Sequence, residues 1–244
     1  MRRITLTDLA NNPDLISGIY NYCDRWCERC PLTSRCLVYA TEQEDDNSFQ
    51  SNDLRNEVFW QKLNAVFKET REMIVEWARE AGVDLNGSTD EDAVWQHRKR
   101  QLVDNHPLTK AGKQYANAAS DWFRELDQAF EIPENFERLE EPREVVQWYQ
   151  YQIAVKTMRA LSGRKEELEE DPEIAEFSRD SDGSAKVALI GIDRSIAAWR
   201  LMQLSLPERA ASVVPLILQL ERLRNRLEKT FPAARGFVRP GFDE

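Results

Sequence analysis

Residues 185–204, AKVALIGIDRSIAAWRLMQL, are strongly apolar and decide the fold that the sequence predicts. The polar positions are too few to form a wide solvent-facing side, and a helix that is apolar nearly all round is normally buried. We therefore predict a central helix over 184–204. Asp193 and Arg194 lie inside this stretch, and charges in such a position need partners on the neighbouring elements.

Amphipathic segments on both sides of this stretch predict the helices that surround it. Apolar residues recur at three- and four-residue steps from Asp53 to Ala81, where Asp53 can cap the first turn and Gly82 ends the helix. The same spacing predicts further helices over 88–103, 108–130, 144–161 and 205–231. In the last of these we expect the buried residues to be Val214, Ile217, Leu218, Leu220, Leu223 and Leu227.

Prolines, glycines and acidic runs predict the connections between these helices. Pro133 and Pro142 bracket one connection, and Gly163 ends the helix that precedes the central one. Residues 41–53 and 164–183 are acidic and contain little to bury, which indicates surface loops.

The fold class that follows is all-α. We predict a helical bundle of about six or seven helices with an N-terminal four-cysteine metal-binding segment, because no strand pair or hairpin pattern is evident. The predicted domains are a docked cysteine segment over 1–40, a bundle over 53–231 and an irregular tail over 232–244.

The charge and the start of the chain limit the class of protein. The 244 residues carry 33 Lys and Arg against 43 Asp and Glu, a formal net charge of −10. Phosphate contacts need a concentrated basic face, so we do not expect a nucleic-acid partner. The opening residues, MRRITLTDLA, lack the apolar run of a secretory signal, and no later segment is apolar enough to cross a membrane. We therefore expect a cytoplasmic protein, in which disulfides are disfavoured.

All four cysteines fall within one short stretch, YCDRWCERCPLTSRC, which spans Tyr22 to Cys36. They are Cys23, Cys27, Cys30 and Cys36, spaced Cx3Cx2Cx5C. A cluster of this kind in a reducing compartment favours a metal centre over disulfides or unligated thiols. The sequence leaves open whether the metal is a [4Fe–4S] cluster or a single zinc ion.

Helix geometry favours the iron–sulfur cluster. Asn12 and Pro13 are typical of a helix start and Pro31 of a helix end, so Cys23 and Cys30 should lie on one face of a helix between them. Seven residues rise about 10 Å along a helix, whereas the sulfurs around one zinc ion lie within about 4 Å of each other. A break in the helix at Asp24 or Trp26 would remove this argument and favour zinc.

The triplet Cys23, Cys27 and Cys30 resembles the Cx3Cx2C motif of radical SAM enzymes, which hold a [4Fe–4S] cluster with three cysteines. The resemblance implies such a cluster here. The chain departs from that family because Arg29 replaces the usual aromatic residue, Cys36 can occupy the open iron, and no barrel pattern follows.

The stretch CERCPLTSRC also resembles the Cx2Cx5C end of the iron–sulfur staple in AddB-type and CRISPR-associated nucleases. This resemblance implies that Cys27, Cys30 and Cys36 are cluster ligands. It does not imply nuclease activity, because the chain contains no Glu-x-Lys motif.

A second candidate site is a group of polar residues on two predicted inner helices. These are Tyr149, Gln152, Lys156, Asp193 and Arg200. They predict either a polar pocket for a small-molecule ligand or cofactor, or interhelical ion pairs that fix the register of the helices.

The functional prediction is a protein that binds a [4Fe–4S] cluster and serves in electron transfer, redox sensing or a redox enzyme, with a redox or other protein partner. The alternative is a zinc-stapled helical module for protein–protein contact. No catalytic residue is predicted, and the sequence does not decide whether the protein is an enzyme.

Overall fold

The computed structural model describes residues 12–45, 57–82, 90–128, 136–167 and 180–243, and within these ranges it contains seven α-helices and no strand. The predicted all-α class is therefore confirmed. The helices are α2 (Leu37–Asp45), α3 (Glu57–Ala81), α4 (Asp90–Asn105), α5 (Pro107–Gln128), α6 (Phe136–Glu167), α8 (Asp180–Ser205) and α9 (Ala210–Thr230).

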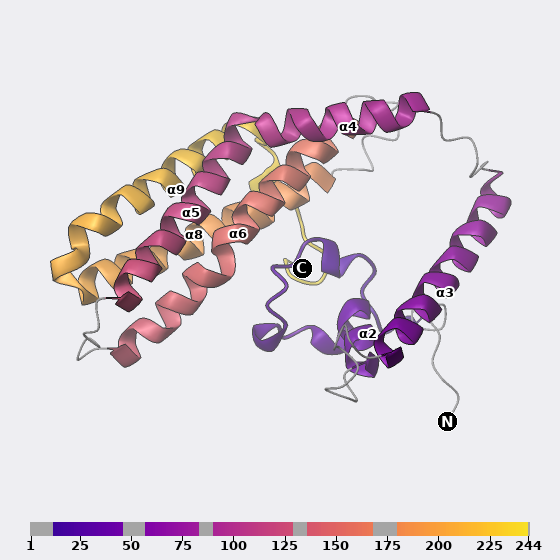
Figure 1. Ribbon diagram of the computed structural model, residues 1–244, viewed down its shortest axis with the longest axis horizontal. Helices are drawn as coiled ribbons and strands as arrows, with labels where there is room; N and C mark the ends of the chain where they lie inside the picture. Colours follow the sequence, from indigo (N-terminus) through magenta and orange to yellow (C-terminus); the bar gives the residue numbers. More distant parts are fainter. Residues whose placement is uncertain (1–11, 46–56, 83–89, 129–135, 168–179, 244) are drawn as a thin grey trace. The chain divides into compact units, whose positions relative to one another are not determined.

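Helix α8 lies at the centre of a bundle, as its apolar sequence predicts. It packs along α6 and α9, and α5 packs against α6 and α9 (Figure 1). The fully buried ring of Trp199 stacks on Phe123 at a centroid distance of 5.4 Å and meets Trp122 edge-on at 5.0 Å. Its indole N–H donates to the hydroxyl of Tyr115 over 2.9 Å. Burial of each such ring stabilises the fold by about 1.5–3 kcal/mol.

Two predicted helix boundaries are wrong, because Pro142 and Gly163 both lie inside α6, while Pro133 lies outside the described residues. Gly163 does not end the helix, and a Cβ built on it would lie 3.5 Å from the Cα of Ser181 on α8. Gly163 therefore lies where α6 and α8 are in van der Waals contact. Pro142 is also helical, since a proline removes only one backbone N–H and α6 is held on both sides of it by buried Leu139 and Val146.

The predicted face of α9 is partly wrong. Ile217, Leu220, Leu223 and Leu227 are buried as expected, but Val214 and Leu218 are 40% and 43% exposed. Val213 and Leu216 take the inward positions instead, so the predicted buried stripe is wrong only in the N-terminal half of α9.

The acidic stretches lie partly in helices. Residues 41–45 belong to α2, so the predicted loop does not start at 41, and 46–56 lie outside the described residues. Of the second stretch, 164–167 are the end of α6 and 180–183 the start of α8, while 168–179 also lie outside.

The contacts divide the chain into two units. The first comprises Met1–Tyr20 with Cys27–Gln96, and the second, here called the bundle unit, comprises Asn21–Trp26 with His97–Glu244. The predicted boundaries at 40, 53 and 231 stay predictions.

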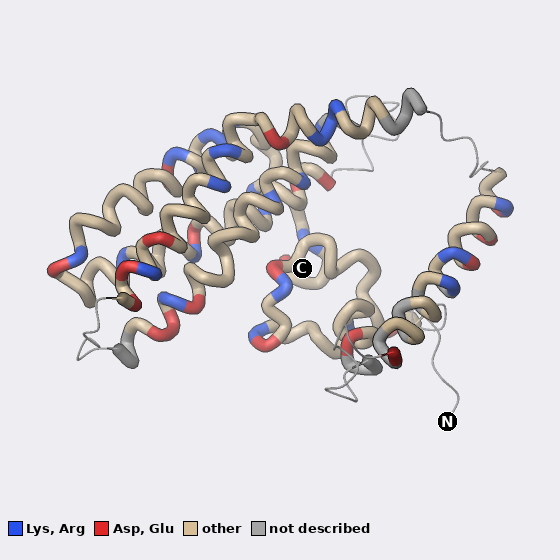
Figure 2. The backbone as a smooth tube through the Cα atoms, in the orientation of Figure 1, with Lys and Arg blue, Asp and Glu red and all other residues tan. Residues whose placement is uncertain are grey.

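Helix α3, in the first unit, confirms the long predicted helix and its end, because Gly82 follows with a φ of 67°. The predicted cap, Asp53, lies outside the described residues. Phe67 and Trp77 on its apolar side are 63% and 60% exposed. Acidic and basic residues are interspersed along α3 (Figure 2).

Candidate functional site

The cysteine segment is not the continuous helix that the sequence predicts. It consists of three short 3-10 turns, η1 (Ile19–Asn21), η2 (Cys27–Arg29) and η3 (Thr33–Arg35), joined by extended residues and bends. Arg25 has a φ of 58°, a left-handed conformation that ends any helix between Cys23 and Cys27. The side chain of Asn12 accepts the N–H of Asp14 over 3.0 Å, but it closes only a local turn.

Two of the cysteine sulfurs accept a backbone hydrogen bond from the residue two positions later. The N–H of Leu32 donates to Sγ of Cys30 over 3.4 Å, and the N–H of Arg25 donates to the sulfur of Cys23. In both cases the donor lies two residues after the cysteine. Hydrogen bonds of this kind stabilise a thiolate, which is the form of cysteine that binds metals.

All four cysteines are described and half-buried, and none is in a disulfide. Burial raises the pKa of the Cys23 thiol, and the Arg25 N–H and the charge of Lys156 act against this rise. A bound metal would also lower the pKa of Cys23, because it favours the thiolate.

The structure does not confirm the predicted metal segment. Cys23 belongs to the bundle unit, and Cys27, Cys30 and Cys36 belong to the first unit. In the described ranges no three His, Cys, Asp or Glu side chains are grouped so that they could hold a metal ion.

Cys36 is held within the first unit through its neighbour Arg35. The carbonyl of Arg35 accepts the N–H of Ile16 over 3.0 Å, and its Nε donates to the carbonyl of Asp14 over 3.2 Å. These bonds join Asp14 and Ile16, which precede Cys23, to Arg35, which precedes Cys36.

Asp24, next to Cys23, is bonded by four side chains of the bundle. Its carbonyl accepts the indole N–H of Trp148 over 2.8 Å and the amide N–H of Gln152. Its carboxylate accepts the hydroxyl of Tyr149 and, over 2.8 Å, the guanidinium of Arg194. Residues of α6 and α8 therefore converge on one residue of the cysteine segment.

The residues on either side of Asp24 are also docked on the bundle. Lys156 donates to the carbonyl of Asn21 over 3.1 Å, and Trp26 stacks on Trp148 with ring centroids 5.0 Å apart. Burial lowers the pKa of Lys156, and the Cys23 thiolate raises it in part. Asn21–Trp26 is therefore a docked segment held along its whole length.

The predicted polar group falls into separate networks. Tyr149 and Lys156, together with Gln152, bind the docked segment. Asp193 instead accepts from Arg224 over 3.2 Å and from Arg235 over 2.6 Å. Arg200 pairs with Glu221 over 3.2 Å.

Asp24 is the residue at the centre of this network that the sequence prediction missed. Its partners lie more than a hundred residues away in the chain, so no local pattern identifies them. The available signal was an acid flanked by Tyr22 and Trp26 beside the first cysteine, because aromatic neighbours predict that the segment is docked rather than solvated.

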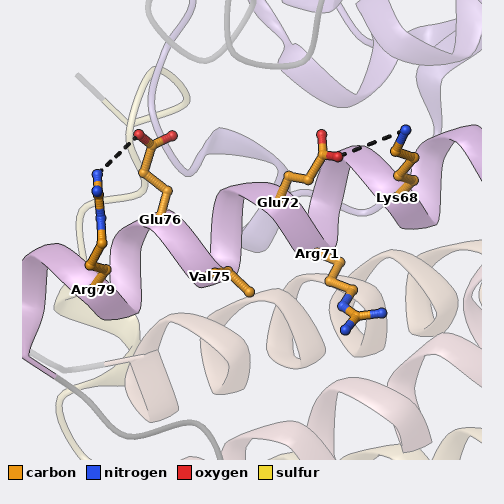
Figure 3. A pocket seen from close by; sticks show the side chains of 6 residues that line it. All are labelled: Lys68, Arg71, Glu72, Val75, Glu76 and Arg79. Atoms are coloured by element: carbon orange, nitrogen blue, oxygen red, sulfur yellow. Dashed lines mark ion pairs between the residues drawn. The ribbon is translucent and has the colours of Figure 1, made fainter.

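A hollow on the first unit follows the surface of α3 (Figure 3). Lys68 pairs with Glu72 over 3.9 Å and Arg79 with Glu76 over 3.6 Å, so these charges compensate each other along one helix. The lining residues are Lys68, Arg71, Glu72, Val75, Glu76 and Arg79. Their side chains belong to a single exposed helix, which gives no group of buried polar atoms for a ligand.

Comparisons of the chain with protein-family models, with curated proteins and with solved structures gave no match. Among the helices that the structure describes, none has both the length and the apolar character needed to cross a bilayer.

Proposed function

We propose that Cys23, Cys27, Cys30 and Cys36 bind a metal centre, and that this centre is a [4Fe–4S] cluster. The observation that carries the proposal is that the sulfurs of Cys23 and Cys30 each accept the backbone N–H of the residue two positions later. Hydrogen bonds to sulfur are a regular feature of metal-bound thiolates and adjust the potential of iron–sulfur clusters.

The chemistry of the donor set fits such a centre. Four cysteines at half-buried positions can supply four thiolates, the usual ligand set of a [4Fe–4S] cluster. When bound, a cluster of this type supplies one-electron transfer. The positive charges of Arg25 and Lys156 lie close enough to Cys23 to favour its thiolate, so the chain itself offsets part of the charge of the ligands.

The function that we infer is electron transfer or redox sensing, because four thiolate ligands leave no iron open to a substrate. A redox-enzyme role would need a ligand site beside the centre. The side chains of Tyr149 and Lys156, which could form one, are used to hold the docked segment. A redox partner protein is therefore a better expectation than a small-molecule substrate.

Zinc is the second candidate, and the broken helix favours it. Cys27 and Cys30 are separated by one 3-10 turn, and left-handed Arg25 separates Cys23 from that turn. The distance along a continuous helix therefore no longer argues against a single tetrahedral ion. With zinc, the centre would be a structural staple in a module for protein–protein contact.

Anaerobic purification with absorption spectra and metal analysis tests the proposal. We expect brown wild-type protein with a broad band at the violet end of the spectrum and with iron and acid-labile sulfide in equal amounts. Cys30→Ser should lose both, whereas Ser34→Ala, an exposed position in the same loop, should keep them.

A colourless protein with zinc that Cys30→Ser removes would identify the zinc staple instead. A protein that binds neither metal, or binds it equally well in Cys30→Ser, would refute the metal centre.

A further inference from the structure

Cys23 lies between two anchors on the bundle unit. On one side the carbonyl of Asn21 accepts the ammonium of Lys156 over 3.1 Å. On the other side Asp24 is bonded through its carbonyl and its carboxylate to α6 and α8. Only Tyr22 and Cys23 lie between the anchors, so the backbone at the cysteine has little freedom to move.

Tyr22 is itself held by packing. Its ring lies 4.8 Å from that of Phe237 in the C-terminal tail, and it occupies the space where Gly183 of α8 has no Cβ. The position of Cys23 is therefore defined by α6, α8 and the tail.

The turn after Cys23 is fixed by Asp24. One carboxylate oxygen accepts the N–H of Trp26 over 3.2 Å, while the other accepts from Tyr149 and Arg194. This turn places Arg25 in its left-handed conformation with its N–H on the sulfur of Cys23. One side chain thus connects the bundle to the hydrogen bond that the Cys23 sulfur accepts.

We propose that Asp24, held by Tyr149 and Arg194, is a positioning residue that presents Cys23 as a preorganised metal ligand on the bundle. The inference rests on the proposed metal centre and deepens it. A ligand whose backbone is already ordered loses less conformational entropy when it binds, so the metal is bound more tightly. Linkage requires the reverse as well: bound metal strengthens the docking of Asn21–Trp26.

The test is a titration of the full-length, metal-free protein with Co²⁺, followed by the absorption of the thiolate–cobalt bond. Residues that orient metal ligands typically change metal affinity about tenfold to hundredfold, so we expect a loss of that size in Asp24→Asn. Tyr149→Phe removes only a hydroxyl and should give a smaller loss. Tyr151→Phe is the matched control on the same helix, because Tyr151 is exposed and its hydroxyl bonds to Ser120 over 2.8 Å.

A second measurement on the same samples distinguishes a positioning role of Asp24 from direct binding of the metal by Asp24. The stacked rings of Trp26 and Trp148 give the docked segment a near-ultraviolet circular dichroism signal, which should weaken in metal-free Asp24→Asn and Tyr149→Phe. Loss of Co²⁺ affinity with an unchanged tryptophan signal would overturn the inference, because Asp24 would then act on the metal itself. Wild-type Co²⁺ affinity in both variants would overturn it as well.

The Co²⁺ titration gives different outcomes if the positioning role of Asp24 is wrong and if the metal centre itself is wrong. If the variants match wild type while Cys30→Ser loses the thiolate–cobalt band, the metal centre stands and only the positioning role is refuted. If wild type shows no thiolate–cobalt band, the metal centre is refuted, and the positioning role falls with it.

Discussion

The hydroxyl of Tyr149 donates a hydrogen bond to the carboxylate of Asp24, which lies 125 residues earlier in the chain. Burial raises the pKa of Tyr149, and the hydrogen bond to Asp24 raises it further, so the hydroxyl stays protonated and remains a donor at neutral pH. Arg194 supplies the compensating charge to the same carboxylate over 2.8 Å. A partly buried acid is thereby shared by two helices of the bundle.

This relationship predicts a measurable coupling energy between Asp24 and Tyr149. Hydrogen bonds to a charged group contribute about 1.5–3 kcal/mol. We expect Asp24→Ala and Tyr149→Phe each to lower the free energy of unfolding, and the double variant to lose about 1 kcal/mol less than the sum of the two. Urea denaturation of the four proteins measures this cycle.

The control for the cycle pairs Asp24→Ala with Tyr151→Phe, whose hydroxyl bonds to Ser120 instead. These two changes should add. Full additivity between Asp24 and Tyr149 would show that their hydrogen bond contributes nothing measurable to stability.

The packing of Tyr22 against Gly183 predicts the effect of a side chain at position 183. A Cβ at this position would lie 2.8 Å from Cζ of Phe237 and closer still to the ring of Tyr22. Gly183→Ala should therefore displace the two rings and lower the free energy of unfolding by about 1–3 kcal/mol, despite the better helix propensity of alanine. Thermal melting measures the change.

Gly236→Ala is the matched control, because a Cβ there would meet nothing within 4 Å. It should leave the melting temperature unchanged or raise it slightly. Equal effects of the two substitutions would mean that Tyr22 does not occupy the space beside Gly183.

The helices of the bundle could be predicted from sequence because their signals are local. The apolar run of α8 and the periodic residues of α5 and α9 identify these helices, although Val214 and Leu218 of α9 are exposed where burial was predicted. The errors concern residues whose role depends on a distant neighbour. Gly163 is typical of a helix end in the sequence, but it lies where α6 approaches Ser181.

The cysteine segment shows the same limit more strongly. Asn12, Pro13 and Pro31 are ordinary markers of helix ends, yet the chain between them forms separate turns. The segment Asn21–Trp26 is held by Asp24 with Tyr149 and Arg194, and these contacts join residues more than a hundred positions apart. The spacing of the cysteines predicts a metal, whereas the path of the backbone depends on the bundle.

The core of the bundle contains a polar contact that should be sensitive to mutation. The indole N–H of Trp199 donates to the hydroxyl of Tyr115, and both side chains are fully buried. Tyr115→Phe would leave the buried indole N–H of Trp199 without its acceptor. We therefore expect the free energy of unfolding to fall by about 1–3 kcal/mol. Tyr151→Phe, which changes a hydroxyl at an exposed position, should cost less than half of that. Similar losses in the two variants, measured by urea denaturation, would contradict this prediction.

Asp243 predicts how the stability contributed by the tail depends on pH. Hydrogen bonds from Arg239 and then Lys186 hold the pKa of this carboxyl well below its usual value. Because the folded-state pKa is lowered, the contribution is present above the unfolded pKa of about 3.9 and is lost as the pH falls through the folded value. Asp243→Asn should therefore lower the free energy of unfolding at pH 7 by up to about 1 kcal/mol, since the pair is partly exposed. The difference from wild type should shrink steadily below about pH 4 in urea denaturation at a series of pH values. A difference that persists unchanged at pH 3 would assign the effect to the shape of the tail and not to the charge of Asp243.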